Sequence, residues 1–144
     1  MQKSTLLKVI SILFIIFGAL SVISALGAFA DNAAFGALGI ISSILSILTA
    51  ALELSAGILG IQKKDNLALC KKLAIGLIVL VIVNGVLNSM VVNGIAAVAG
   101  LDSSIGLAAG VTTGLISMIF GLLFPVLYLI GAVISKSSNQ NTPQ

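Results

Sequence analysis

Residues 35–61 read FGALGIISSILSILTAALELSAGILGI, an apolar stretch in which Glu53 is the only charged residue. Because a helix needs about 20 apolar residues to cross the hydrocarbon of a bilayer, this stretch predicts a transmembrane helix. Its small residues recur with Glu53 at alternating steps of three and four, the spacing of a left-handed helix seam. The stripe comprises Gly36, Gly39, Ser43, Ser46, Ala50, Glu53, Gly57 and Gly60. The pattern predicts that the carboxyl group faces neighbouring helices and not lipid.

Three further stretches are long enough to span a bilayer, near residues 9–29, 73–99 and 105–134. Of all residues 59% are hydrophobic and 8% are charged, whereas soluble domains are roughly one quarter charged. The short connections between the spans favour antiparallel neighbours. The sequence therefore predicts an all-α integral membrane protein, an up-down-up-down four-helix bundle over residues 1–134, followed by a disordered polar tail over residues 135–144.

The lysines indicate the orientation, because cytoplasmic flanks of membrane helices retain positive charge. They precede the first span, fill the middle connection and follow the fourth span. The lysines are Lys3, Lys8, Lys63, Lys64, Lys71, Lys72 and Lys136. The other two turns carry only Asp31 and Asp102 as charged residues, so we expect both termini to be cytoplasmic. The basic groups are dispersed, without arginine or interleaved aromatic residues, and therefore indicate contact with anionic lipid and not with nucleic acid.

The first span also has features of a secretory signal peptide. Lys3 and Lys8 precede an apolar run, and Ala28-Phe29-Ala30 forms an A-x-A cleavage pattern. The apolar core runs from Val9 to Leu26, whereas a signal core has about 7 to 15 residues. We therefore expect a retained first helix, with cleavage as the alternative.

Five residues form a candidate polar layer inside the membrane. At about 1.5 Å per residue, Glu53 lies roughly 12 Å from the cytoplasmic boundary, Tyr128 about 10 Å and Asn84 about 18 Å. Asn88 shares a helix face with Asn84 because the two are four residues apart. Pro125 has no N–H group to donate, so it predicts a helix kink and a carbonyl acceptor in the same layer.

Two interpretations of this layer stay open. In the functional one, Glu53 binds a proton or a small cation, with Tyr128, Asn84 or Asn88 as hydrogen-bond partners, since intramembrane acids mark such sites. In the structural one, a protonated Glu53 only fixes helix register, and interhelical hydrogen bonds of that kind contribute about 0.6 to 2 kcal/mol. The spans contain no second acid and no base, which favours the structural interpretation.

Catalysis finds little support in the sequence. The chain has no histidine, arginine or tryptophan and one cysteine, Cys70. Neither a Ser–His pair nor paired aspartates can be assembled within the spans. The glycines lack the GK[ST] ending of a phosphate-binding loop. We therefore expect no catalytic residue, no metal and no cofactor.

Two segments carry a resemblance: residues 53–61, ELSAGILGI, and residues 124–132, FPVLYLIGA. They resemble uncharacterised small four-helix integral membrane proteins of Gram-positive bacteria. Members of that group carry an acidic position before a Gly-Ile-Leu-Gly run, a Lys-rich inner loop and a Pro-x-Leu-Tyr-x-x-Gly-Ala ending. The resemblance spans most of the chain and implies a four-helix bundle in a bacterial cytoplasmic membrane. It implies no activity.

The functional prediction is a non-enzymatic small integral membrane protein. We expect an accessory or scaffolding component that packs in the bilayer with itself, as a homo-oligomer, or with a larger membrane-protein partner. The alternative is an oligomeric proton- or cation-coupled transporter or channel centred on Glu53. A toxin or stress-response membrane protein is a third hypothesis, which the sequence does not distinguish from the first.

Overall fold

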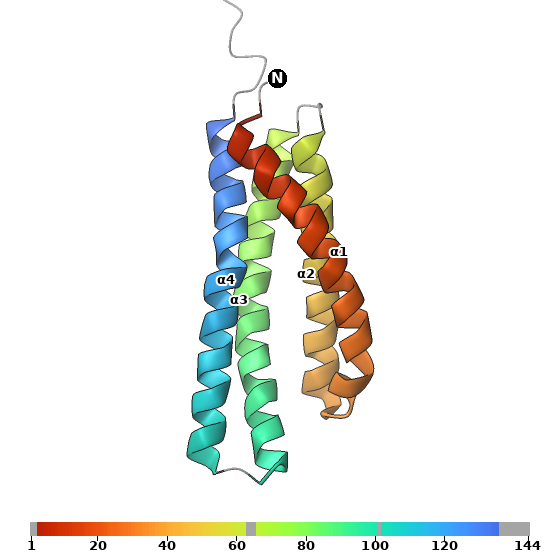
Figure 1. The fold of residues 1–144 in the computed structure, drawn as a ribbon, viewed down its shortest axis with the longest axis vertical. Helices are drawn as coiled ribbons and strands as arrows, with labels where there is room; N and C mark the ends of the chain where they lie inside the picture. The colour runs from red at the N-terminus through yellow and green to blue at the C-terminus, as the bar shows by residue number, and fades with distance from the viewer. Residues whose placement is uncertain (1–2, 63–65, 101, 136–144) are drawn as a thin grey trace, which may run out of the picture.

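The computed structural model describes residues 3–62, 66–100 and 102–135, and its secondary structure is helical (Figure 1). The helices are α1 (Thr5–Ala33), α2 (Gly36–Ile61), α3 (Leu67–Val98) and α4 (Ser103–Ile134). All four are long and apolar enough to cross a membrane, so the prediction of four helical spans is confirmed. Residues 63–65 of the Lys-rich connection and residues 136–144 of the predicted tail lie outside the described residues.

α1 and α3 begin four and six residues before the apolar spans predicted from the sequence. α1 begins at Thr5, where the backbone N–H of Leu7 donates to Ser4 Oγ over 3.1 Å and caps the helix. α3 begins at Leu67, six residues before its predicted span, although Lys71 and Lys72 interrupt the apolar run. The extension forms because Leu67 and Cys70 are buried in the core while the lysines lie on other faces of the same turns.

The two short turns use glycine and one aspartate. Gly36 and Gly100 both have φ of +73°, a left-handed conformation that favours glycine. In the first turn, the backbone N–H of Phe35 donates to the carbonyl of Asn32 over 3.0 Å. In the second, Ser104 N–H donates to a carboxylate oxygen of Asp102 over 3.2 Å and caps α4.

Glycines allow close approach of the backbones in two helix pairs, α1 with α2 and α3 with α4. A Cβ atom added at Gly57 would lie 2.7 Å from the carbonyl oxygen of Ser11. One added at Gly110 would lie 2.6 Å from the carbonyl oxygen of Ser89. Because lipid tails provide no hydrophobic drive for helix association, van der Waals contact of this kind must hold membrane helices together.

The hydrophobic core lies at one end of the bundle, where the N-terminal end of α1 and the C-terminal end of α4 come together (Figure 1). At this end the backbone N–H of Ser4 donates to Ser135 Oγ over 2.8 Å, and Ser4 Oγ donates to the carbonyl of Gly131. The buried core residues are Leu7, Ile10, Phe14, Ala56, Leu67, Cys70, Ala74, Leu77, Tyr128 and Ala132. Leucine, isoleucine and valine side chains cover the outer surface, as expected for a bundle surrounded by acyl chains.

Candidate functional site

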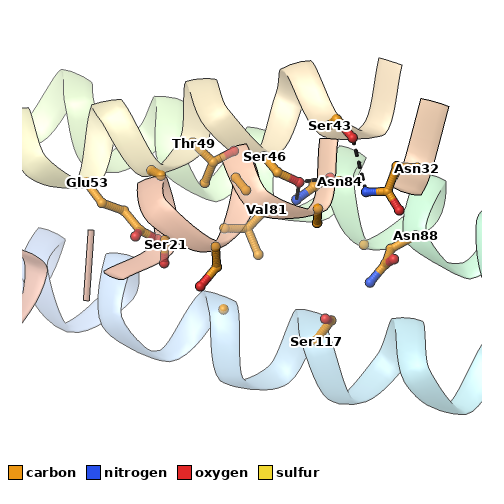
Figure 2. Close-up of a pocket in the computed structure, with 16 residues that line it drawn as sticks. Ser21, Asn32, Ser43, Ser46, Thr49, Glu53, Val81, Asn84, Asn88 and Ser117 are labelled. Atoms are coloured by element: carbon orange, nitrogen blue, oxygen red, sulfur yellow. Dashed lines mark hydrogen bonds between the residues drawn. The ribbon is translucent and has the colours of Figure 1, made fainter. Parts of the chain in front are cut away.

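Away from the packed end, residues of all four helices surround a polar cleft with a volume of about 400 Å³ (Figure 2). Its polar lining comes mainly from α1, α2 and α3. The polar residues are Ser21, Ser24, Asn32, Ser43, Ser46, Thr49, Glu53, Asn84, Asn88 and Ser117. Among the described residues that line the cleft, Glu53 is the only one with a charge. The structure therefore brings Glu53, Asn84 and Asn88 of the predicted site to one cavity.

Aromatic rings close the space between α1 and α4 at the packed end. Phe14 lies against Tyr128 with ring centroids 5.3 Å apart, and Phe17 lies against Phe124 at 5.7 Å. Farther along α1, side chains line the cleft and remain exposed. These exposed lining residues are Ser21 and Ser24 of α1 and Ser117 of α4. The cleft is thus closed at one end and open along its α1–α4 flank.

The Glu53 side chain is partly buried and points into the cavity from α2 (Figure 2). Within the described part of the chain, no group forms a hydrogen bond with its carboxyl oxygens or lies in a salt bridge with them. A carboxyl group in an apolar environment is stable only when it is protonated, paired or hydrated. The open cavity supplies the space for hydration or for a bound partner.

The hydroxyl groups near Glu53 present oxygen lone pairs to the cavity. Thr49 Oγ1 donates its proton to the carbonyl of Leu45 over 2.8 Å, and Ser46 Oγ donates to the carbonyl of Ser42 over 2.9 Å. Asn84 Nδ2 lies 3.3 Å from Ser46 Oγ and donates to it, which links α3 to α2. Because these hydroxyl protons are used within the helix, the side chains act as acceptors toward the cleft.

The far end of the cleft has two further amides. Asn32 Nδ2 donates to Ser43 Oγ over 3.0 Å, and Asn88 projects into the cavity from α3 (Figure 2). Gly121 lines the cleft on α4. Its carbonyl has no donor at Pro125, because proline lacks an N–H group. α4 continues without interruption through Pro125, which is buried.

Tyr128 lies outside the cleft, in the packed core beneath it. Its hydroxyl donates to the carbonyl oxygen of Ala56 over 2.7 Å, one helical turn along α2 from Glu53. The ring is fully buried against Phe14. The structure therefore pairs the Tyr128 hydroxyl with the backbone of α2 and leaves Glu53 without it.

The sequence did not single out several residues of the cleft. Thr49, Ser24 and Asn32 line it, and each continues a face already occupied by small polar residues. The available signal was the repetition of Ser, Thr and Asn at three- and four-residue steps on the first two spans. The same repetition is equally typical of close packing, because serine packs as tightly as alanine in membrane helices.

A second polar cluster at the packed end was also missed. Lys3 Nζ donates to the carbonyl of Leu59 and to Asn66 Oδ1, both over 2.6 Å. Asn66 Nδ2 donates to the same Leu59 carbonyl over 2.9 Å. The cluster joins the residues before α1 to the last turn of α2 and the first residue before α3, where a positive charge complements the C-terminal end of the helix dipole.

Comparisons of the chain with protein-family models, with curated proteins and with solved structures return no significant match. Within the residues that the structure describes, no group of three or more His, Cys, Asp or Glu side chains is placed to hold a metal ion. The class of protein that the fold supports is a small helical protein with four candidate membrane spans.

Proposed function

We propose that this chain is a small, non-enzymatic, multi-pass membrane protein that binds a proton or a small cation at Glu53. The observation that carries the proposal is the carboxyl group of Glu53, which faces a polar cavity of about 400 Å³ inside helices able to span a membrane. Ionisable residues within membrane spans are costly and mark pathways for ions and protons. A carboxyl with a solely structural role would be expected to have a protein hydrogen-bond partner.

The proposal includes an up-down-up-down topology with both termini on the cytoplasmic side of a bacterial cytoplasmic membrane. Lys8 and Lys72 are exposed near the packed end, whereas Asp31 and Asp102 are exposed near the two short turns. Retention of positive charge in the cytoplasm supports this orientation, and the resemblance of residues 53–61 and 124–132 supports the bacterial membrane. The cleft then lies in the half of the bundle opposite to the termini.

Transport across the membrane would require a change at the packed end, where the buried rings of Phe14 and Tyr128 and the side chain of Leu77 fill the space below the cleft. We propose that a transporter or channel formed by this chain is oligomeric, because four helices enclose little space. In that assembly Glu53 of each copy would be the proton or cation site.

The test is flux through liposomes that contain the purified full-length protein. We expect proton or alkali-cation flux with the unmodified protein and background flux with Glu53→Gln, which keeps the shape of the side chain and removes its charge. Ser55→Ala is the matched control, because Ser55 is exposed and its hydroxyl bonds only to the carbonyl of Ala51 on its own helix. Absence of flux in the unmodified protein, with a Glu53→Gln effect on thermal stability alone, would contradict the proposal.

An accessory or scaffolding role is the second candidate, and one feature of α4 favours it. Small side chains near the N-terminal end of this helix form a shallow exposed groove. They are Ser104, Ala108, Ala109, Thr112 and Thr113. Such a surface permits close approach of a further membrane helix, from a second copy or a larger partner. Recovery of one stoichiometric partner after crosslinking in membranes would favour this role over transport.

A further inference from the structure

We propose that the cation taken up by the cleft is a primary ammonium group carried by an amphiphilic organic molecule. The inference rests on the proposed cation-binding function and adds the chemical class of the ligand. Four properties of the cleft carry it: its volume, its single charge, its hydrogen-bond acceptors and its open flank.

The volume matches an organic molecule better than a bare ion. At about 400 Å³, the cavity falls within the range of about 300 to 1,000 Å³ typical of small-molecule sites. A bound calcium-type ion needs about six to eight oxygen ligands that converge on one point. In Figure 2 the polar groups are instead distributed along the cleft, with Glu53 at one end and Asn32 and Asn88 at the other.

The charge of the lining selects a monovalent cation. Glu53 supplies the one carboxyl group among the described lining residues, and none of them is a lysine. A divalent ligand would keep an uncompensated positive charge in the membrane, and an anionic group would have no cationic partner there. A single positive charge opposite a single carboxylate is the balanced combination.

The hydrogen-bonding groups of the cleft favour a ligand that donates hydrogen bonds. Thr49 directs its hydroxyl proton to a helix carbonyl and keeps its lone pairs for the cavity, whereas Ser46 Oγ already accepts from Asn84 Nδ2. A primary ammonium group offers three N–H donors and suits such a lining. A quaternary ammonium ion offers none and is usually held by aromatic rings, and no aromatic residue occurs among the described residues that line the cleft.

The open flank accommodates the apolar part of the ligand. Along the gap between α1 and α4, Ala28 of α1 lines the cleft and is exposed, as are Ser21 and Ser117. In a bilayer the outer edge of this flank faces acyl chains, whereas the polar interior of the cleft is hydrated. An alkyl chain can therefore lie beside lipid while the ammonium group reaches Glu53, so that neither end of the ligand is placed in an unfavourable medium.

The experiment measures binding of radiolabelled hexylammonium to the full-length protein in phosphatidylcholine nanodiscs, with empty nanodiscs subtracted. Hexyltrimethylammonium is the matched probe, since it keeps the charge and the alkyl chain but has no N–H donor. We expect saturable binding of hexylammonium, at least about tenfold tighter than that of hexyltrimethylammonium, because hydrogen bonds to a charged group are lost in the latter.

Two lining variants and one control locate the site. Glu53→Gln is expected to weaken hexylammonium binding by at least about tenfold. Thr49→Val, which removes one acceptor oxygen at nearly constant shape, is expected to weaken it by about threefold to tenfold. The Thr49→Val variant keeps the test valid if the Glu53→Gln protein fails to fold. Ser55→Ala, on the exposed face of α2, should bind with unchanged affinity.

The outcomes separate this inference from the proposed function. Equal affinity for the two probes, or no saturable binding of either, would overturn the ammonium proposal. If Glu53-dependent proton or sodium flux persisted in that case, the proposed cation-binding function would stand alone. Absence of both binding and flux would overturn both proposals.

One additional binding experiment distinguishes a lipid headgroup from a free amine as the source of the ammonium group. Nanodiscs that contain phosphatidylethanolamine present the same primary ammonium as a lipid headgroup. Loss of hexylammonium binding in these nanodiscs, relative to phosphatidylcholine, would support the proposal with the lipid as the ligand. Unchanged binding would support it with a free amine as the ligand.

Discussion

Glu53 and Tyr128 reach the interior of the bundle within one helical turn of each other, and their hydrogen bonding differs. The Tyr128 hydroxyl is fully buried and donates to the carbonyl of Ala56. The Glu53 carboxyl faces the cleft. A polar group sealed within a membrane bundle must find a partner in the protein, whereas a group at a cavity can bind water or a ligand. We therefore propose different roles for the two residues: Tyr128 joins helices and Glu53 provides a site.

Tyr128→Phe tests the structural role of the tyrosine. The substitution removes the donor to Ala56 but keeps the ring that packs on Phe14 at 5.3 Å between centroids. We expect a loss of about 0.6 to 2 kcal/mol in the free energy of unfolding, because the lost bond is a single interhelical one. Unfolding in detergent measures it. Tyr128→Ala should lose about 3 to 5 kcal/mol, because it also leaves a cavity. A loss of similar size in the two variants would contradict this assignment.

At the scale of the helix, two glycines of similar sequence context have opposite surroundings. A Cβ atom at Gly60 of α2 would collide with Ser11 Oγ of α1 and lie 3.1 Å from the Tyr128 ring of α4. A Cβ atom at Gly76 of α3 would meet no atom within 4 Å. Gly60 is therefore required because three helices meet at its surface and leave no room for a side chain. Gly76 has no such neighbours and only lowers helix propensity.

Gly60→Ala and Gly76→Ala form a matched pair of substitutions. We expect Gly60→Ala to lower the free energy of unfolding by about 1 to 3 kcal/mol through overpacking. Gly76→Ala should raise it by up to about 1 kcal/mol, because alanine favours the helix. Denaturant unfolding of both variants provides the comparison. Adding Ser11→Ala to Gly60→Ala should restore part of the lost free energy of unfolding. If the effects of the two substitutions were strictly additive, that result would contradict a contact between residues 60 and 11.

The sequence predicted these helices well, but it did not distinguish packed faces from the cleft. On α1, Ser11 and Gly18 pack closely against α2, while Ser21 and Ala25 on the same stripe line the cavity. Periodicity identifies the face of a helix that points inward, but it carries no information on the distance to the next helix. Likewise, the sequence predicted Tyr128 as a hydrogen-bond partner of Glu53, whereas its hydroxyl donates to the carbonyl of Ala56. A backbone carbonyl of another helix has no signature in sequence.

The whole molecule combines a packed half with an open half. At the packed end, the Lys3 ammonium group holds the carbonyl of Leu59 and Asn66, and a continuous core lies beneath it. Toward the short turns, the pair of α1 and α2 separates from the pair of α3 and α4 around the cleft (Figure 1). We expect a ligand or water molecule to reach Glu53 through the open half, along the cleft. In the proposed orientation, a proton or ligand would therefore enter from the side of the membrane opposite to the termini.

Accessibility of introduced cysteines tests this one-sided arrangement. In a Cys70→Ala background, Ser24→Cys and Ser117→Cys place thiols at exposed positions of the cleft, and Ser11→Cys places one in the buried contact between α1 and α2. Maleimides react with the thiolate, which requires water. We expect a membrane-impermeant maleimide added to intact cells to label the two cleft positions and to leave Ser11→Cys unlabelled.

The same reagent added to inside-out vesicles provides the control for sidedness. We expect little labelling of Ser24→Cys or Ser117→Cys there, because the rings of Phe14 and Tyr128 separate the cleft from the packed end. Rapid labelling of the cleft thiols in the vesicles, with none in cells, would reverse the proposed orientation while keeping the cleft. Labelling of Ser11→Cys at the rate of Ser24→Cys would instead show that water penetrates both halves, which contradicts a cavity closed at one end.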